Sequence, residues 1–280
     1  IFMLFNLQLR AVQATDAKDT YEFGHYFGLR LITSLIAIVF VSIILFIGHY
    51  DVQTSWIIFL IALSKGIESI SDIVFGLLQK HERMDRIALS QILKGPLSLV
   101  FLAIILWLTG SLISAIIGLI VTWLCLLVLY DFTNARSFSR VIPQIDRRRL
   151  WELVKLSFPL GIVMMLVSLN PNIPRYFIEG YLGAEQLGYF AAITYIMVAG
   201  NTVVNALGQS ASPRLAKLYA NQQMDKYKKL LLRLVAVGLC LGIIGIITVI
   251  FVGEHILCIL YSKEYADYNH IFHRHGKCRY

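Results

Sequence analysis

Long, almost uncharged apolar runs constrain the fold of this chain more than any other feature of its sequence. Examples are residues 31–48, 112–130 and 231–253. About 20 apolar residues in an α-helix span the hydrocarbon core of a bilayer. The composition agrees, since 58% of the 280 residues are hydrophobic and 15% are charged. In soluble domains about half of the residues are apolar and about a quarter are charged. We therefore predict an all-α, polytopic membrane helical bundle.

The positions of the apolar runs predict about seven complete membrane-spanning helices. The first nine residues are also apolar, but they are too few to span a bilayer and no cleavage-like site follows them. We interpret them as the end of a further helix and not as a signal peptide. The seven predicted spans are residues 29–49, 55–78, 91–109, 112–130, 156–178, 187–210 and 231–253.

Positive charge is concentrated in alternate connections between the predicted spans. Basic residues gather at 10–30, 80–94, 136–155 and 214–233, whereas the intervening short connections hold only Lys263. By the positive-inside rule, the basic connections lie in the cytoplasm. We interpret the net charge of +8 as a topological signal that also contacts anionic lipid headgroups. Membrane lipids are therefore expected partners, and nucleic acid is not.

The span at 55–78 contains charges, which membrane helices normally exclude. At about 100° per residue, Lys65, Glu68 and Asp72 fall in one polar stripe. Charge in hydrocarbon is costly, so this stripe predicts the wall of a polar substrate cavity. Glu68 and Asp72 are also candidates for proton coupling, because like charges one turn apart favour protonation of one of them. The alternative is that Lys65 and Glu68 neutralise each other locally.

A second polar face follows in the span at 156–178 and just beyond it. Asn172, Arg175 and Glu179 share this face, and the span contains three prolines. Prolines kink or break helices, and broken helices with polar residues at the break often line transporter sites. We therefore add Asn172 and Arg175 to the predicted cavity. The alternative is an Arg175–Glu179 ion pair that reaches the outer interface.

In the span at 187–210, Asn201 and Asn205 lie on one helix face. Their amides are suited to hydrogen-bond sugars in the same cavity. The alternative is that they join neighbouring helices, as polar residues in membrane bundles commonly do.

No catalytic constellation is found in the sequence, so we expect no enzyme activity and no cofactor. Phosphate-binding loops, nucleophile motifs and zinc-protease motifs are missing. The C-terminal tail contains His270, His273, His275 and Cys278, which are residue types that bind zinc. However, the tail leaves the apolar pattern abruptly, so we interpret it as a truncated or frame-shifted end without a metal.

Three stretches carry a family resemblance. Residues 68–80, 9–17 and 180–190 read E-S-I-S-D-I-V-F-G-L-L-Q-K, L-R-A-V-Q-A-T-D-A and G-Y-L-G-A-E-Q-L-G-Y-F. Together they resemble bacterial polysaccharide-biosynthesis membrane proteins. These are lipid-linked oligosaccharide flippases of the multidrug/oligosaccharidyl-lipid/polysaccharide exporter superfamily. The resemblance covers residues 1 to about 270.

The resemblance implies a MATE-like transporter fold of two similar halves, present here in part. Residues 1–150 would hold the end of helix two to helix six of the N-terminal half. Residues 151–270 would hold helices seven to nine of the C-terminal half. Residues 271–280 do not resemble the family, which puts residues 273–280 in doubt as native sequence.

The resemblance also implies a function. Such proteins move polyprenyl-pyrophosphate-linked oligosaccharide repeat units across the bacterial cytoplasmic membrane, for O-antigen, lipopolysaccharide, capsule or exopolysaccharide biosynthesis. Other polysaccharide-assembly proteins are then expected partners. We expect Lys65 and Arg175, as the only basic residues within the spans, to shelter the pyrophosphate. The alternatives are a drug/cation antiporter of the same superfamily, a membrane glycosyltransferase or polymerase, and a non-functional fragment.

Overall fold

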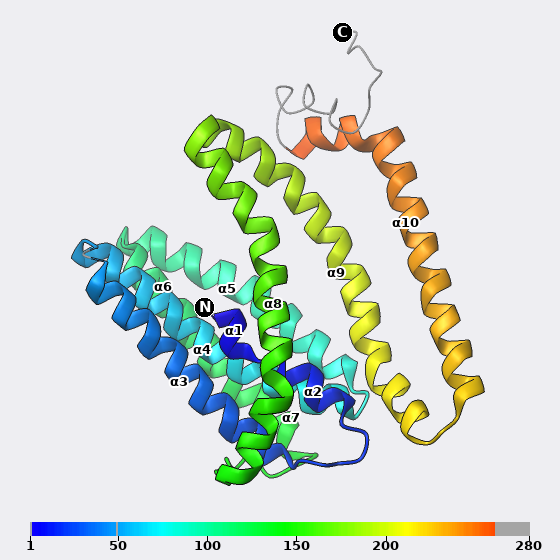
Figure 1. Cartoon of the computed structure of the whole chain (residues 1–280). Helices are drawn as coiled ribbons and strands as arrows, with labels where there is room; N and C mark the ends of the chain where they lie inside the picture. The colour runs from blue at the N-terminus through cyan, green and yellow to red at the C-terminus, as the bar shows by residue number, and fades with distance from the viewer. Residues whose placement is uncertain (1, 49, 261–280) are drawn as a thin grey trace. The chain divides into compact units, whose positions relative to one another are not determined.

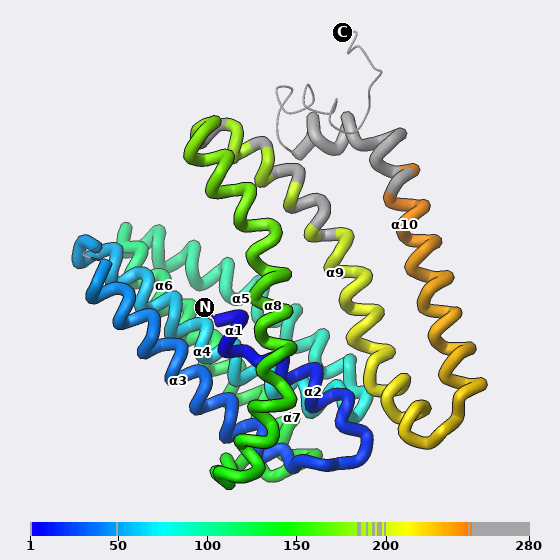
Figure 2. Tube along the Cα trace, viewed as in Figure 1, coloured from blue at the N-terminus to red at the C-terminus, as the bar shows by residue number. Residues whose placement is uncertain are grey.

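The computed structural model describes residues 2–48 and 50–260, and every regular element in these ranges is a helix (Figure 1). Figure 2 follows the same path as a Cα tube. The elements in chain order are α1 (Phe2–Asn6), α2 (Leu9–Thr15), α3 (Phe23–Ile47), α4 (Val52–Lys80), α5 (Met84–Thr109), α6 (Leu112–Leu126), the π-helical turn η1 (Leu127–Asp131), α7 (Phe132–Arg136), α8 (Arg147–Leu182), α9 (Ala184–Ala220) and α10 (Met224–Leu260).

The predicted spans fall on these helices, which confirms the all-α prediction. Each span lies within one helical run, apart from Gly48, which follows the end of α3, and residue 49, which is outside the described residues. Among the described residues, four runs are long and apolar enough to cross a membrane, namely Phe23–Ile47, Met84–Thr109, Leu112–Arg136 and Arg147–Leu182.

Large apolar side chains cover the outside of these helices. Phe46 and Trp107 are 87% and 85% exposed, and many leucines, isoleucines and valines are exposed with them. A water-soluble protein rarely exposes so continuous an apolar surface. The protein is therefore a multi-pass membrane protein whose helices present apolar side chains to lipid.

The chain divides into two compact units, which we describe separately. The first comprises Ile1–Ser168 and Ser212–Ala220, and the second Leu169–Ala211 and Asn221–Tyr280. The predicted boundary between halves at residues 150 and 151 remains a prediction.

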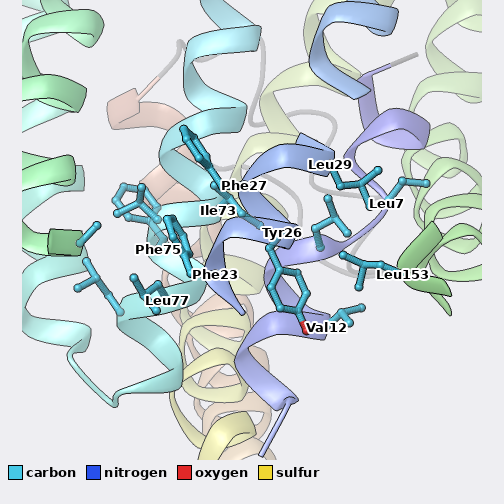
Figure 3. Packing of buried hydrophobic residues seen from close by; sticks show 14 of the residues in the cluster. Leu7, Val12, Phe23, Tyr26, Phe27, Leu29, Ile73, Phe75, Leu77 and Leu153 are labelled. Atoms are coloured by element: carbon cyan, nitrogen blue, oxygen red, sulfur yellow. The ribbon is translucent and has the colours of Figure 1, made fainter. Parts of the chain in front are cut away.

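In the first unit, α4 is the central helix and contacts α2, α3, α5, α6, η1 and α7. The C-terminal half of α4 is buried from Ile73 to Gln79. In α3, most of the buried residues lie in the N-terminal half. Because consecutive helices run in opposite directions, these buried halves lie at the same end of the bundle. The cluster includes Tyr26, Ile73 and Leu153, from α3, α4 and α8 (Figure 3). The packed core therefore lies at the end of the bundle that carries the basic connections.

The connection between α2 and α3 is held against this end through Asp16. The Asp16 carboxylate accepts hydrogen bonds from the backbone N–H groups of Thr20 and Tyr21, at 3.0 and 3.1 Å. Lys80, the last residue of α4, lies 3.8 Å from the same carboxylate. Burial raises the pKa of Asp16, but these hydrogen bonds and the Lys80 ammonium outweigh burial, so the pKa lies below its usual value. The ionised carboxylate thus ties the connection to α4.

We predict that Gly76→Ala destabilises the protein, because α2 approaches α4 closely at this glycine. A Cβ at Gly76 would lie 2.5 Å from the Gln13 side-chain amide and 3.2 Å from the Arg10 Cα. Overpacking of this kind costs about 1–3 kcal/mol, so the melting temperature in detergent should fall.

Gly95→Ala, in α5, is the matched control, since nothing lies within 4 Å of a Cβ built there. Alanine at this position should leave the melting temperature unchanged or raise it, because alanine favours helix over glycine by about 1 kcal/mol. Equal effects of the two substitutions would contradict the close packing of α2 on α4.

Candidate functional site

Three of the predicted cavity residues lie on α4, but they have different surroundings. Lys65 and Glu68 form an ion pair, with 2.6 Å between Nζ and Oε2, and both side chains are half exposed. Asp72 lies one turn further on and is only 25% exposed. The structure therefore contains the local Lys65–Glu68 contact that was the alternative interpretation. Asp72 instead belongs to a buried network at the packed end of the bundle.

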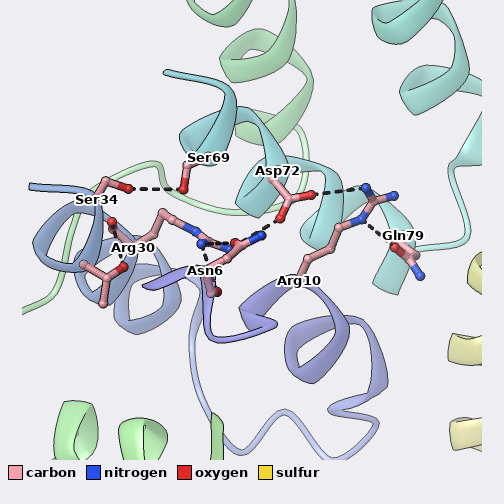
Figure 4. A network of polar contacts seen from close by, with 8 residues as sticks. Asn6, Arg10, Arg30, Ser34, Ser69, Asp72 and Gln79 are labelled. Carbon is pink, nitrogen blue, oxygen red and sulfur yellow. Dashed lines mark hydrogen bonds and ion pairs between the residues drawn. The ribbon is translucent and has the colours of Figure 1, made fainter. Parts of the chain in front are cut away.

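Asp72 binds two arginines from two other helices (Figure 4). Arg10 of α2 lies 3.2 Å from its Oδ1, and Arg30 of α3 lies 3.4 Å from its Oδ2. Arg10 also donates from Nε to Gln79 Oε1, at 2.9 Å. One carboxylate on α4 thus holds α2 and α3 in register.

Arg30 is fully buried, and a break in the N-terminal helix supplies one of its partners. Leu7 and Gln8 have φ of 51° and 50°, so the chain turns sharply between α1 and α2. A helix end leaves its last carbonyls without helical partners. The carbonyl of Asn6, the last residue of α1, accepts a hydrogen bond of 2.9 Å from Arg30 Nη1. The Asn6 side-chain oxygen accepts from the same nitrogen.

The contacts of this network lower the free-energy cost of burying charge in an apolar bundle. An isolated buried ion is very costly, and pairing with added hydrogen bonds offsets most of that cost. Two guanidinium groups face one carboxylate here, so the cluster of Arg10, Arg30 and Asp72 retains one formal positive charge. The arrangement places a net cation beside α4, close to the core of the first unit.

A second buried network joins α4 to α5 and to the π-helical turn. Asp131, at the end of η1, is fully buried. Its carboxylate accepts a hydrogen bond of 2.6 Å from Ser90 Oγ and another of 2.8 Å from Lys94 Nζ. Lys94 also donates to Ser71 of α4, at 2.7 Å. A π-helical turn shifts the side chains that follow it around the helix axis, and such turns are frequent at functional sites.

Phe75 of α4 connects the two networks. Arg10 Cζ lies 5.6 Å from the centre of its ring, and Lys94 Nζ lies 4.8 Å from it. Cations are attracted to the faces of aromatic rings. Phe75 therefore contacts one cation from each network.

The prediction that Lys65 and Arg175 are the only basic residues within the helical spans is wrong. Arg30 and Lys94 were assigned to connections between spans, but they lie inside α3 and α5. Both helices are long and apolar enough to cross a membrane. The physical reason is that each cation has a carboxylate partner, the partly buried Asp72 or the fully buried Asp131, which lets it occupy a helix interior.

A pattern in the sequence could have revealed these residues. Arg30, Thr33 and Ser34 follow one another at helical spacing, and all three are buried on one face of α3. Ser90 and Lys94 are likewise one turn apart, and both bind Asp131. Polar residues that recur every three or four positions indicate a polar helix face. Assigning each charged residue to a connection between spans hides this pattern.

The other predicted cavity residues belong to the second unit. Asn172 and Arg175 are partly buried on α8, and the Arg175 Nε has no hydrogen-bond partner. Asn201 and Asn205 are exposed on α9. Their meeting with Lys65, Glu68 and Asp72 around one cavity remains a prediction.

α8 is one continuous helix from Arg147 to Leu182. Of the expected kink or break at its prolines, the break is therefore wrong, and the kink remains a prediction. Each proline removes a single backbone hydrogen bond, and the remaining bonds of a 36-residue helix maintain it. The expected ion pair of Arg175 with Glu179 is not among the ion pairs of the described residues.

The tail residues His270, His273, His275 and Cys278 lie outside the described residues, so the interpretation of residues 271–280 remains a prediction. Within residues 2–48 and 50–260, no group of three or more histidine, cysteine or carboxylate side chains is placed to hold a metal ion.

We predict that Asp72→Asn destabilises the protein much more than Glu68→Gln, one turn away on the same helix. Removal of one partner from a buried ion pair costs about 3–5 kcal/mol, whereas an exposed pair contributes about 0–1 kcal/mol. The melting temperatures of both variants in detergent test this difference, and size-exclusion chromatography shows whether each variant stays monodisperse. Equal losses would show that Asp72 does not hold two buried arginines.

Three comparisons place the chain among known proteins. A family model described as "Polysaccharide biosynthesis protein" matches residues 1–219. The capsular polysaccharide biosynthesis protein CapF of Staphylococcus aureus is 29% identical over 272 residues, which cover 96% of this chain and 67% of CapF.

Among solved structures, a multidrug resistance MATE family transporter of the MOP superfamily, in an outward-facing conformation, matches with a TM-score of 0.72. That match covers 95% of this chain and 64% of the transporter, at 12% identity, so it shows a shared fold alone. The chain thus spans about two thirds of the length of both proteins. The family match covers most of the chain, and the protein belongs to the polysaccharide biosynthesis protein family, with a MATE-like helical membrane fold.

Proposed function

We propose that the protein exports polyprenyl-pyrophosphate-linked oligosaccharide repeat units across the bacterial cytoplasmic membrane. The observation that carries this proposal is the family match over residues 1–219 of a helical membrane protein. CapF is named for capsular polysaccharide biosynthesis, so a capsule or a similar surface polysaccharide is the favoured product. We propose a transporter without enzyme activity, which receives its substrate from other polysaccharide-assembly proteins.

The physics of the substrate explains why a polar bundle is needed. A sugar headgroup cannot cross hydrocarbon unaided, because its hydroxyl groups would lose their hydrogen bonds to water. A hydrated cavity with cationic groups would shelter both the sugar and the pyrophosphate. Lys65 and Arg175 remain our candidates for these cations. Lys65 is half exposed, and the Arg175 Nε has no hydrogen-bond partner.

The buried residues would have a different task. Asp72 is held by Arg10 and Arg30, so we assign these arginines to positioning the helices and not to direct substrate contact. We retain Glu68 and Asp72 as candidates for proton coupling. Protonation of Asp72 would weaken its hold on both arginines and thereby loosen α2 and α3 from α4.

We predict that Lys65→Gln combined with Arg175→Gln lowers polysaccharide export in the full-length protein by about tenfold or more, since one lost ionic contact of about 1.5 kcal/mol is worth about tenfold. The measurement is surface polysaccharide in a strain that lacks the native gene, with accumulation of lipid-linked repeat units in the cytoplasmic leaflet.

Lys18→Gln with Arg136→Gln is the matched control. It removes the same charge from two exposed positions, and export should stay near the level of the unchanged protein. Intact export in the Lys65 and Arg175 variant would rule out these cations as the pyrophosphate site. Loss of drug resistance without loss of polysaccharide would favour the antiporter alternative.

We also propose that the basic connections face the cytoplasm. Exposed positions at opposite ends of the helices, Ser137 and Thr109, test this orientation as single cysteines in a variant without the four native cysteines. We predict that Thr109→Cys reacts with a membrane-impermeant maleimide in intact cells, and that Ser137→Cys reacts only after permeabilisation. The reverse pattern would invert the topology.

A further inference from the structure

We propose that the first turns of α8 and α3 form a binding site for the headgroup of an anionic glycerophospholipid. The two helices border a cavity of about 1010 Å³, which is large for a small-molecule site. All the residues that line it belong to the first unit. The inference does not rest on the proposed export function.

The charge of the cavity favours an anion. Arg147, Arg148 and Lys155 line it, and Glu152 is its one acidic lining residue. Glu152 lies 3.4 Å from Arg148, in a pair whose side chains are 45% and 88% exposed. Such an exposed pair is weak, so an incoming phosphate can displace it. The lining thus carries two more formal positive charges than negative ones.

The remaining lining is apolar, which favours a lipid over a soluble anion. Leu29 and Ile32 of α3 and Leu150 and Val154 of α8 line the cavity. These side chains are suited to the glycerol and the upper acyl chain of a phospholipid. Inorganic phosphate would gain nothing from them.

Trp151 also lines the cavity. Its side chain is 60% exposed, and the Lys155 ammonium lies 5.5 Å from the centre of its ring. Tryptophan is enriched at the level of lipid headgroups. Arg148 and Lys155 are seven residues apart, which is about 10 Å along the helix, so a phosphate beside Trp151 lies between two cations.

The position along the helices fits the same ligand. The cavity lies where α8 begins, directly after a basic connection, at the end of the bundle predicted to face the cytoplasm. Anionic lipids concentrate in that leaflet, and basic pockets between membrane helices on that side bind anionic headgroups. We therefore assign the site to a bilayer phospholipid such as phosphatidylglycerol.

The direct test is retention of lipid by the purified full-length protein, measured by native mass spectrometry. Phosphatidylglycerol should be retained in preference to phosphatidylcholine with the same acyl chains. Arg148→Gln with Lys155→Gln should lower retention of phosphatidylglycerol by about 25-fold, at about fivefold for each cation removed.

Arg140→Gln with Arg149→Gln is the control for charge alone. Both arginines are exposed, Arg140 on the connection before α8 and Arg149 in the first turn of α8, and neither lines the cavity, so retention should be unchanged. An equal loss in this control would overturn the proposal in favour of a diffuse surface effect. Equal retention of the two lipids by the unchanged protein would also overturn it, and so would displacement of phosphatidylglycerol by polyprenyl pyrophosphate at lower concentration.

A second readout needs no charge variant. In bilayers that contain brominated phosphatidylglycerol, the bromine atoms quench the fluorescence of nearby tryptophans, and the part of the quenching that is lost in the Trp151→Phe variant comes from Trp151. This Trp151 quenching should be greater than that measured with brominated phosphatidylcholine at the same mole fraction. Equal quenching of Trp151 by the two lipids would overturn the site.

Discussion

The rest of the first unit depends on the need to pair the Asp72 carboxylate inside an apolar bundle. A lone buried charge would be too costly to retain, and the fully buried Arg30 beside the partly buried Arg10 would be costlier still without a carboxylate. Arg10 and Arg30 therefore hold α2 and α3 to α4 through Asp72. Asn6 extends the arrangement to α1, because the turn after it leaves its carbonyl available to Arg30.

This constraint divides α4 into two parts with different tasks. Its C-terminal half packs the core and binds the buried cations, and its middle exposes Lys65 and Glu68. In the export function that we propose, stability and substrate contact would therefore belong to different turns of one helix. Phe75 and the pair of Lys94 with Asp131 extend the rigid part towards α5 and η1. A rigid end and a polar, accessible middle are what an export cavity would require of such a helix.

The sequence predicts the helices well, because length and apolarity are local properties. The polar stripe of Lys65, Glu68 and Asp72 was also visible, since helical periodicity places residues on a face. The partners of Asp72 were not predicted, because Arg10 and Arg30 lie 62 and 42 residues away and only tertiary packing brings them together. The break expected at the prolines of α8 is not found, because each proline removes a single backbone hydrogen bond and the other bonds of a 36-residue helix remain.

A double-mutant cycle between Arg30 and Asp72 is the most direct test of this account. It compares the free energies of unfolding of Arg30→Gln, Asp72→Asn and the double variant in detergent. If the two side chains pair in the bundle, the loss of unfolding free energy in the double variant should be smaller than the sum of the two single losses. The difference should be about 1.5 kcal/mol or more. Single losses that add to within about 0.5 kcal/mol would contradict the account, because independent side chains would then occupy these two positions.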